Sequence, residues 1–147
     1  MCCREILGFD ADADGSQDDG TLFSLAGEFF EAARVLQARP RVRIGYSSVI
    51  YYLLGHSAEL FLKAFLYKHG RTINDLKRIN HDLQKLADLA REAGLPETVK
   101  LEKTLRLSAT YKEKSLEYRT RKRKTFPALG FLTEEINKLQ SAVFDTL

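Results

Sequence analysis

Apolar residues recur every three or four positions over most of the chain, and this spacing predicts amphipathic helices rather than strands. The first helical pattern begins at Leu22, and Pro40 follows its end. A second, longer pattern runs from about Val42 to His69, with Gly70 as its predicted stop. Because apolar residues cover a wide arc of this second helix, we expect it to be central in a bundle. Its predicted apolar stripe is Val49, Leu53, Leu60 and Ala64, flanked by Ile50, Leu54, Phe61 and Phe65.

The segment after Gly70 predicts a connector and then a third helix. Residues 71–80 indicate a connector with about one helical turn at residues 75–78. Asn80 is the predicted N-cap of the third helix, since its side chain can accept from the first free backbone N–H groups. Gly94 and Pro96 then end this helix.

The last third of the chain predicts two more helices. One covers Glu97 to about Thr110, and the other begins after Thr133. In the latter, Glu134 and Glu135 fall in the predicted first turn, where the helix dipole favours acidic side chains. The fold class predicted from these elements is all-α, a bundle of four to five helices. Residues 1–20 are predicted to be an acidic flexible leader and residues 21–147 a single helical domain.

Composition narrows the class of protein. Cys2 and Cys3 are adjacent and cannot cross-link distant parts of a fold, which suits a reducing cytosol. The longest uncharged stretch, Ile44 to Ala58, is too short and too polar to span a bilayer. We therefore expect a cytoplasmic protein with no membrane partner. The leader matches the first half of an EF-hand loop, but Thr21 stands where a glutamate is required, so no metal or cofactor is predicted.

Polar residues interrupt the apolar run of the long helix. His56, Glu59 and Lys63 are spaced by three and four, so they share one stripe. Either Glu59 and Lys63 form an ion pair at the edge of the buried face, with His56 bound to a hydroxyl, or these residues line a polar groove. His81 and Asp82 open the third helix and either fix the connector locally or face the same groove. No residue of this set is assigned a catalytic role.

A dense basic run is the candidate for nucleic-acid binding. The formal net charge is only +3, so an electrostatic argument depends on local clustering of this kind. Arginines and lysines can contact phosphates, and interleaved aromatic rings such as Tyr111 and Phe126 can stack on unpaired bases. The alternatives are a solvated loop that keeps the protein soluble, or an acidic protein partner. The candidate residues are Tyr118, Arg119, Arg121, Lys122, Arg123 and Lys124.

Two short strings together resemble the HEPN family. The first is GHSAELFLKA at residues 55–64, in which a lysine follows a glutamate after four positions. The second is NHDLQKL at residues 80–86, and LEYR at residues 116–119 is similar to a segment that precedes the last helix in some members. The resemblance implies a small α-helical bundle, often a homodimer, of prokaryotic defence and toxin–antitoxin systems.

The resemblance also frames the expected function. Many HEPN proteins are metal-independent ribonucleases whose signature is an arginine, four to six intervening residues and a histidine. None of the three histidines, His56, His69 and His81, has an arginine at that spacing. The resemblance therefore implies a non-catalytic or degenerate member that binds RNA or a partner protein such as a minimal nucleotidyltransferase. The alternative is a toxin-like ribonuclease with a non-standard site around His56, His81 and residues 119–124.

Overall fold

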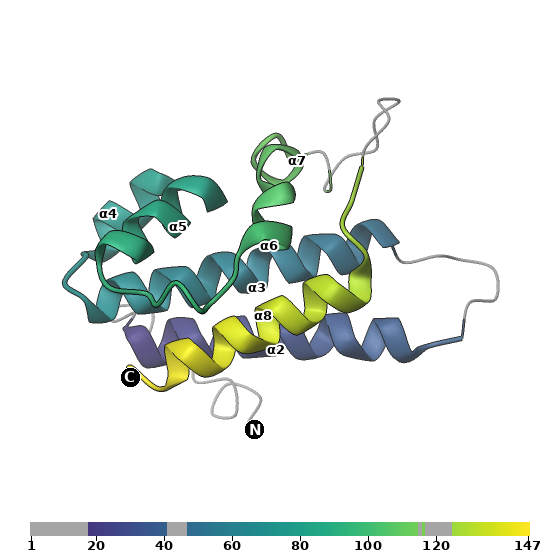
Figure 1. Ribbon diagram of the computed structural model, residues 1–147, viewed down its shortest axis with the longest axis horizontal. Helices are drawn as coiled ribbons and strands as arrows, with labels where there is room; N and C mark the ends of the chain where they lie inside the picture. Colours follow the sequence, from purple (N-terminus) through teal and green to yellow (C-terminus); the bar gives the residue numbers. More distant parts are fainter. Residues whose placement is uncertain (1–17, 41–46, 115, 117–124) are drawn as a thin grey trace, which may run out of the picture.

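The computed structural model describes residues 18–40, 47–114, 116 and 125–147, and all regular structure within these ranges is helical. The predicted all-α fold class is confirmed. Four of the helices have ten residues or more, and three are shorter (Figure 1). In chain order the helices are α2 (Asp19–Ala38), α3 (Ser47–Lys68), α4 (Ile73–Ile79), α5 (Leu83–Glu92), α6 (Glu102–Arg106), α7 (Ser108–Lys112) and α8 (Leu129–Phe144).

The central helix is α3, as its wide apolar arc predicted. It lies antiparallel to α2 and also packs against α5 and α8 (Figure 1). Six consecutive residues, 57–62, are buried, so the middle of α3 has protein on every side. The buried face is centred on the flanking positions of the predicted stripe: Ile50, Leu54, Phe61 and Phe65 are buried, whereas Val49 in the stripe is 47% exposed. The predicted stop is confirmed by Gly70, which follows the helix with a positive φ of 100°.

The same helix is also long and apolar enough to cross a membrane, judged by length and composition. In the folded chain, 72% of its most apolar 18-residue stretch is buried. Its neighbours α2, α5 and α8 supply the contacts that cover it. The apolar surface of α3 therefore has protein partners within this fold.

Helices α4 and α5 follow α3, and both pack against it. A full helix, α4, forms where the sequence predicted about one turn, because Thr72 and Asp75 make a reciprocal capping box at its start. The predicted cap of the next helix was wrong. Asn80 has a φ of 59° and ends α4, whereas the Asp82 side chain accepts a hydrogen bond from the Lys85 backbone N–H at 3.1 Å and caps α5.

The helix predicted over Glu97–Thr110 forms only from Glu102 onward, and there as two short helices instead of one. The chain after α5 is irregular, and only the short helices α6 and α7 form in this region. The guanidinium group of Arg91 donates to the backbone carbonyls of Pro96 and Val99. Because these bonds hold carbonyl groups that a helix would use internally, the segment before α6 stays open.

The last helix begins earlier than predicted, at Leu129 instead of after Thr133. The hydroxyl of Tyr51 donates to the carbonyl of Pro127 at 2.5 Å, and the Tyr51 ring stacks on Phe126 with centroids 4.5 Å apart. These contacts attach the chain to α3 immediately before α8. The tertiary anchor thus outweighs the local helix-start signal at the glutamates.

A buried carboxylate joins α8 to α6. Glu135 is 7% exposed and lies in the second turn of α8, not in the first turn as predicted. Its oxygens accept from the backbone N–H groups of Lys103 and Thr104, at 3.2 and 2.6 Å, and from the Thr104 hydroxyl at 2.7 Å. Since α6 has no capping side chain of its own, Glu135 supplies the cap from another helix.

Candidate functional site

The polar stripe predicted on the long helix is centred on one buried carboxylate. Glu59 on α3 is 2% exposed, and Lys63, one turn later, is 12% exposed. The Lys63 Nζ atom donates to Glu59 Oε1 at 2.6 Å. This is the ion pair that the i,i+4 spacing offered as one of its two interpretations.

Side chains from two other segments form hydrogen bonds with the second oxygen of the same carboxylate. The hydroxyl of Tyr111 on α7 donates to Glu59 Oε2 at 2.5 Å, and the His81 Nδ1 atom lies 3.0 Å from that oxygen. His56 Nδ1 lies 2.7 Å from the Tyr111 hydroxyl oxygen and 3.5 Å from Glu59 Oε2. The Glu59 cluster is this set of five residues: His56, Glu59, Lys63, His81 and Tyr111.

A glycine in the middle of α3 gives Tyr111 its place. A Cβ atom added at Gly55 would lie 3.2 Å from the Tyr111 Cδ1 atom and 3.5 Å from two further ring carbons. The tyrosine ring therefore rests directly on the backbone of α3. From that position its hydroxyl reaches Glu59, one helical turn along.

The hydrogen bonds define which ring nitrogen of each imidazole carries a hydrogen and points into the cluster. An ionised carboxylate only accepts, so His81 donates to Glu59 through Nδ1–H. The Tyr111 hydroxyl donates its hydrogen bond to Glu59, and its oxygen therefore accepts from Nδ1–H of His56. When either histidine is neutral, the lone pair that can take up a proton is on Nε2.

The cluster keeps Glu59 ionised despite its burial. Burial alone would raise the pKa of this carboxyl, since it disfavours the charged form. The opposing contributions of His56, the Lys63 ammonium and the Tyr111 hydroxyl are together larger and lower the pKa from 4.5 to about 2. The carboxylate is thus a stable anion at neutral pH, around which two histidines and a lysine are held.

The two histidines are the members of the cluster nearest to solvent. The His56 side chain is 19% exposed and that of His81 is 29% exposed. The Phe29 ring of α2 meets the His56 ring edge-on with centroids 4.5 Å apart, and the Tyr52 ring stacks on it at 5.8 Å. Aromatic rings therefore enclose His56 on two sides and fix the orientation of its imidazole.

Asp82, the fifth predicted groove residue, does not join the Glu59 cluster. Its carboxylate caps α5 and also accepts from Lys112 Nζ on α7 at 3.1 Å. The backbone N–H of Lys85 is the main cause that lowers the pKa of Asp82; burial opposes it and Lys112 adds to it. Asp82 thus fixes the segment that carries His81, while the His81 side chain itself faces the polar stripe of α3, which is the second of the two sequence interpretations.

The predicted nucleic-acid-binding residues lie outside the described residues: Tyr118, Arg119, Arg121, Lys122, Arg123 and Lys124. Two aromatic residues that flank them in the sequence are described, and neither is free to stack on a base. Tyr111 is 4% exposed and belongs to the Glu59 cluster. Phe126 is partly buried against the core and stacks on Tyr51.

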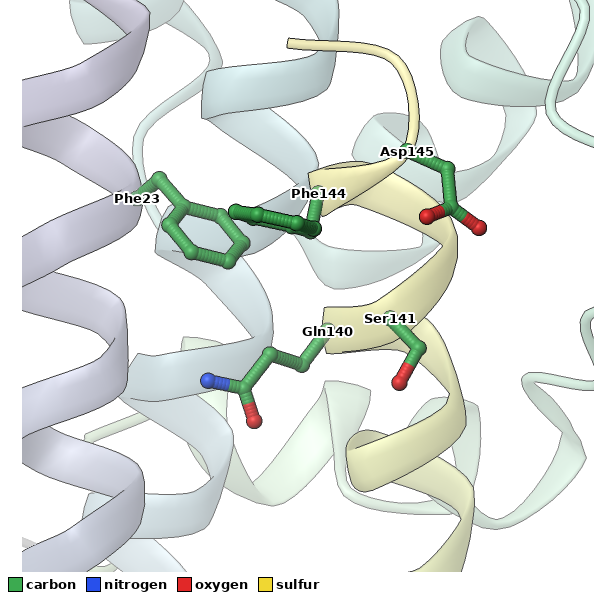
Figure 2. Close-up of a pocket in the computed structure, with 5 residues that line it drawn as sticks. All are labelled: Phe23, Gln140, Ser141, Phe144 and Asp145. Atoms are coloured by element: carbon green, nitrogen blue, oxygen red, sulfur yellow. The ribbon is translucent and has the colours of Figure 1, made fainter.

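A separate hollow of about 440 Å³ lies between α2 and α8 (Figure 2). Its rim holds the tilted pair of rings of Phe23 and Phe144, with centroids 5.8 Å apart, and the Gln140 side chain points toward α2 below them. None of the site residues predicted from the sequence borders it. Within the described part of the chain, no three His, Cys, Asp or Glu side chains are grouped as a metal site.

No match was found when the chain was compared with protein-family models, with curated proteins and with solved structures. A functional argument therefore rests on the geometry of the site. The Glu59 cluster holds two imidazoles in a defined tautomer beside a lysine, through hydrogen bonds among its own side chains. That arrangement suits either a rigid structural centre or acid–base chemistry at the two Nε2 atoms.

Sequence reasoning missed two functional side chains. The sequence predicts Tyr111 as a ring that can stack on unpaired bases, and Glu135 as an acid that the helix dipole favours in a first turn. The signal that pointed to Tyr111 is Gly55, because a glycine inside an otherwise apolar helix indicates the close approach of another group. No local signal marks Glu135, since its partner Thr104 lies 31 positions away.

Proposed function

We propose that the chain is a HEPN-like helical module that acts by binding and not by catalysis. In this proposal the four longer helices, α2, α3, α5 and α8, form the bundle that the resemblance implies. The partner is RNA, bound through the predicted basic run, or a protein such as a minimal nucleotidyltransferase. A homodimer in the cytoplasm is the proposed assembly and location.

The closed hydrogen bonding of Glu59 carries this proposal. Oε1 accepts from Lys63, and Oε2 accepts from Tyr111 and His81. In the described part of the chain, no buried side-chain nitrogen or oxygen lacks a hydrogen-bond partner. A carboxylate whose two oxygens both accept hydrogen bonds from the protein is not available as a general base, and a satisfied buried network makes a structure rigid. The missing arginine–histidine spacing supports the same conclusion.

A single set of measurements tests binding against catalysis. Labelled single-stranded RNA is incubated with the full chain in EDTA, and cleavage is followed by gel electrophoresis while binding is followed by fluorescence anisotropy. We expect binding without turnover. If the basic run contacts phosphates, the log–log slope of affinity against salt is about −0.7 for each contact.

Two variants separate the contributions of phosphate and base. Replacement of Arg121, Arg123 and Lys124 by Gln should flatten the salt slope and leave the melting curve almost unchanged, because surface charges add little to stability. Tyr118→Ala should lower the affinity at an unchanged slope, because stacking on a base releases no counterions. A chain that binds no RNA at low salt leaves the protein partner, which co-purification from the native cell followed by mass spectrometry would identify.

The alternative function is a metal-independent ribonuclease, and one observation favours it. Glu59 holds Nδ1–H of His81 directly and Nδ1–H of His56 through the Tyr111 hydroxyl, which leaves two oriented Nε2 atoms for proton transfer. A carboxylate that orients a histidine in this way is part of many acid–base sites. EDTA-resistant cleavage with multiple turnovers that is lost in His81→Ala and in His56→Ala would establish this alternative. Cleavage that both variants retain would indicate a contaminating nuclease.

A further inference from the structure

A second candidate site lies where α6 meets α8, apart from the predicted basic run. We propose that this surface binds one unpaired nucleotide, with the base on the ring of Phe131 and the phosphate among Lys100, Lys103 and Lys138. The inference rests on the proposed binding of RNA and names the residues of the described chain that would take part. We call this surface the Phe131 platform.

An exposed aromatic ring is its first feature. Phe131 in the first turn of α8 is 63% exposed, although the apolar side chains beside it on this helix, such as Leu132, are buried. The Lys103 Nζ atom lies 5.8 Å from the centre of the ring. Because this cation lies over one face of the ring, a nucleotide would stack its base on the other face while its phosphate binds the lysines.

The hollow beside Phe131 has room for a phosphate group. Its volume is about 190 Å³, and its border consists of Lys100, Lys103, Phe131, Glu134, Glu135 and Lys138, with Thr98 at the edge. Pockets that enclose a drug-sized ligand are larger, about 300 Å³ or more. Because water occupies roughly 30 Å³ per molecule, this hollow holds a small hydrated group and leaves an attached base outside.

The charges of the hollow favour an anion. Glu135 is committed to the start of α6, where its oxygens accept from Lys103 N–H, Thr104 N–H and the Thr104 hydroxyl. Glu134 pairs with Lys138 at 3.3 Å. Within the described part of the chain, neither Lys100 nor Lys103 makes an ion pair. Two ammonium groups are thus without a carboxylate partner next to the exposed ring.

The order of the sequence connects this surface with the predicted basic run. That run ends at Lys124, seven residues before Phe131. A chain of seven residues spans at most about 25 Å. A single strand that contacts the basic run therefore has the Phe131 platform within the reach of a few nucleotides.

The test compares matched variants for binding to labelled oligouridine and oligoadenosine and to free AMP. We expect Phe131→Ala to weaken binding about five-fold or more at an unchanged salt slope, and Phe131→Trp to retain it, because stacking needs only a flat ring. The control is Phe144→Ala, which removes an equally exposed phenylalanine, 65%, from the other end of the same helix (Figure 2). Thermal melting verifies that each variant is folded.

Charge variants test the phosphate half of the proposal. Lys100→Gln together with Lys138→Gln should weaken binding and flatten the salt slope by about 0.7 for each lost contact, while Lys77→Gln on the exposed face of α4 should change neither. Glu134→Gln should strengthen binding, because it removes a like charge and releases Lys138 from its ion pair. An increase in affinity cannot result from loss of folding.

The outcomes distinguish this inference from the function on which it rests. RNA binding that Phe131→Ala weakens no more than Phe144→Ala does would overturn the Phe131 platform and leave RNA binding in place. AMP binding that depends on Phe131, without binding of either oligonucleotide, would make a free nucleotide the ligand and overturn the RNA function. Binding of neither ligand would overturn both.

Discussion

Replacement of Glu59 by Gln is the most direct test of the buried cluster. The variant keeps the size of the side chain and removes the charge that Lys63 and the two histidines surround. Since the folded chain lowers the pKa of Glu59 from 4.5 to about 2, the ionised carboxylate stabilises the fold. That stability is fully present above the ordinary pKa and is lost as the pH falls toward 2.

The size of the effect follows from these two pKa values. A tenfold change in a protonation equilibrium corresponds to about 1.4 kcal/mol, so the interval from 4.5 to about 2 corresponds to about 3 kcal/mol. The side chain is 2% exposed, and solvent screening therefore removes little of this contribution. Linkage places about 2 kcal/mol of the loss between pH 7 and pH 3, with the rest at lower pH.

Urea unfolding at several pH values measures the effect. At pH 7 we expect Glu59→Gln to be less stable than the wild type by about 3 kcal/mol, and the two unfolding free energies should converge as the pH approaches 2. The control is Glu102→Gln, which removes a carboxylate that is 70% exposed in an ion pair with Arg106; it should cost about 0.5 kcal/mol or less. A difference between Glu59→Gln and the wild type that stays constant from pH 7 to pH 3 would refute the reasoning.

Three further predictions concern the cluster and the packing of the helices elsewhere in the fold. Tyr111→Phe removes the hydroxyl that bonds His56 and Glu59, and it should lower the unfolding free energy by about 1–3 kcal/mol in urea titrations. Gly27→Ala should stabilise by about 0.5–1 kcal/mol, because its Cβ would meet only a flexible side chain at 3.7 Å; Gly55→Ala should give no such gain, and equal melting temperatures for the two variants would contradict this. Glu135→Ala should leave the start of α6 uncapped and cost about 1–3 kcal/mol, with faster amide exchange confined first to residues 102–106.

The spacing of residues that are close together in the sequence predicted much of this fold correctly. The end of α2 before Pro40, the central position of α3 and the stop at Gly70 all follow from apolar spacing and from a glycine that can take a positive φ. The start of α2 does not, since the helix begins at Asp19, within the predicted leader of residues 1–20, where the Asp18 side chain caps it. The ion pair of Glu59 and Lys63 also follows from spacing, since residues four apart on a helix are neighbours. Such features depend on groups within about one helical turn, and the sequence contains all of that information.

The errors occur where a side-chain contact or a backbone conformation outside the helical periodicity decides the structure. Helix α8 begins early because Tyr51 holds Pro127, 76 positions away, and the segment after α5 stays irregular because the Arg91 side chain occupies its carbonyl groups. At the Asn80–Asp82 turn, both residue types are good caps, and the backbone conformation selected Asp82.

The candidate site shows most clearly which features the sequence predicts and which depend on the tertiary structure. Its histidines, glutamate and lysine could be named from their spacing, because three of them share one stripe of α3. The hydrogen-bond partner of that stripe could not be named, because Tyr111 lies 52 positions from Glu59. It reaches Glu59 only when α7 crosses α3 at Gly55. Periodicity records which side of a helix faces the core, whereas the partner across the core depends on how the helices are packed. The hydrogen bonds that turn separate polar residues into one cluster therefore exist only in the folded chain.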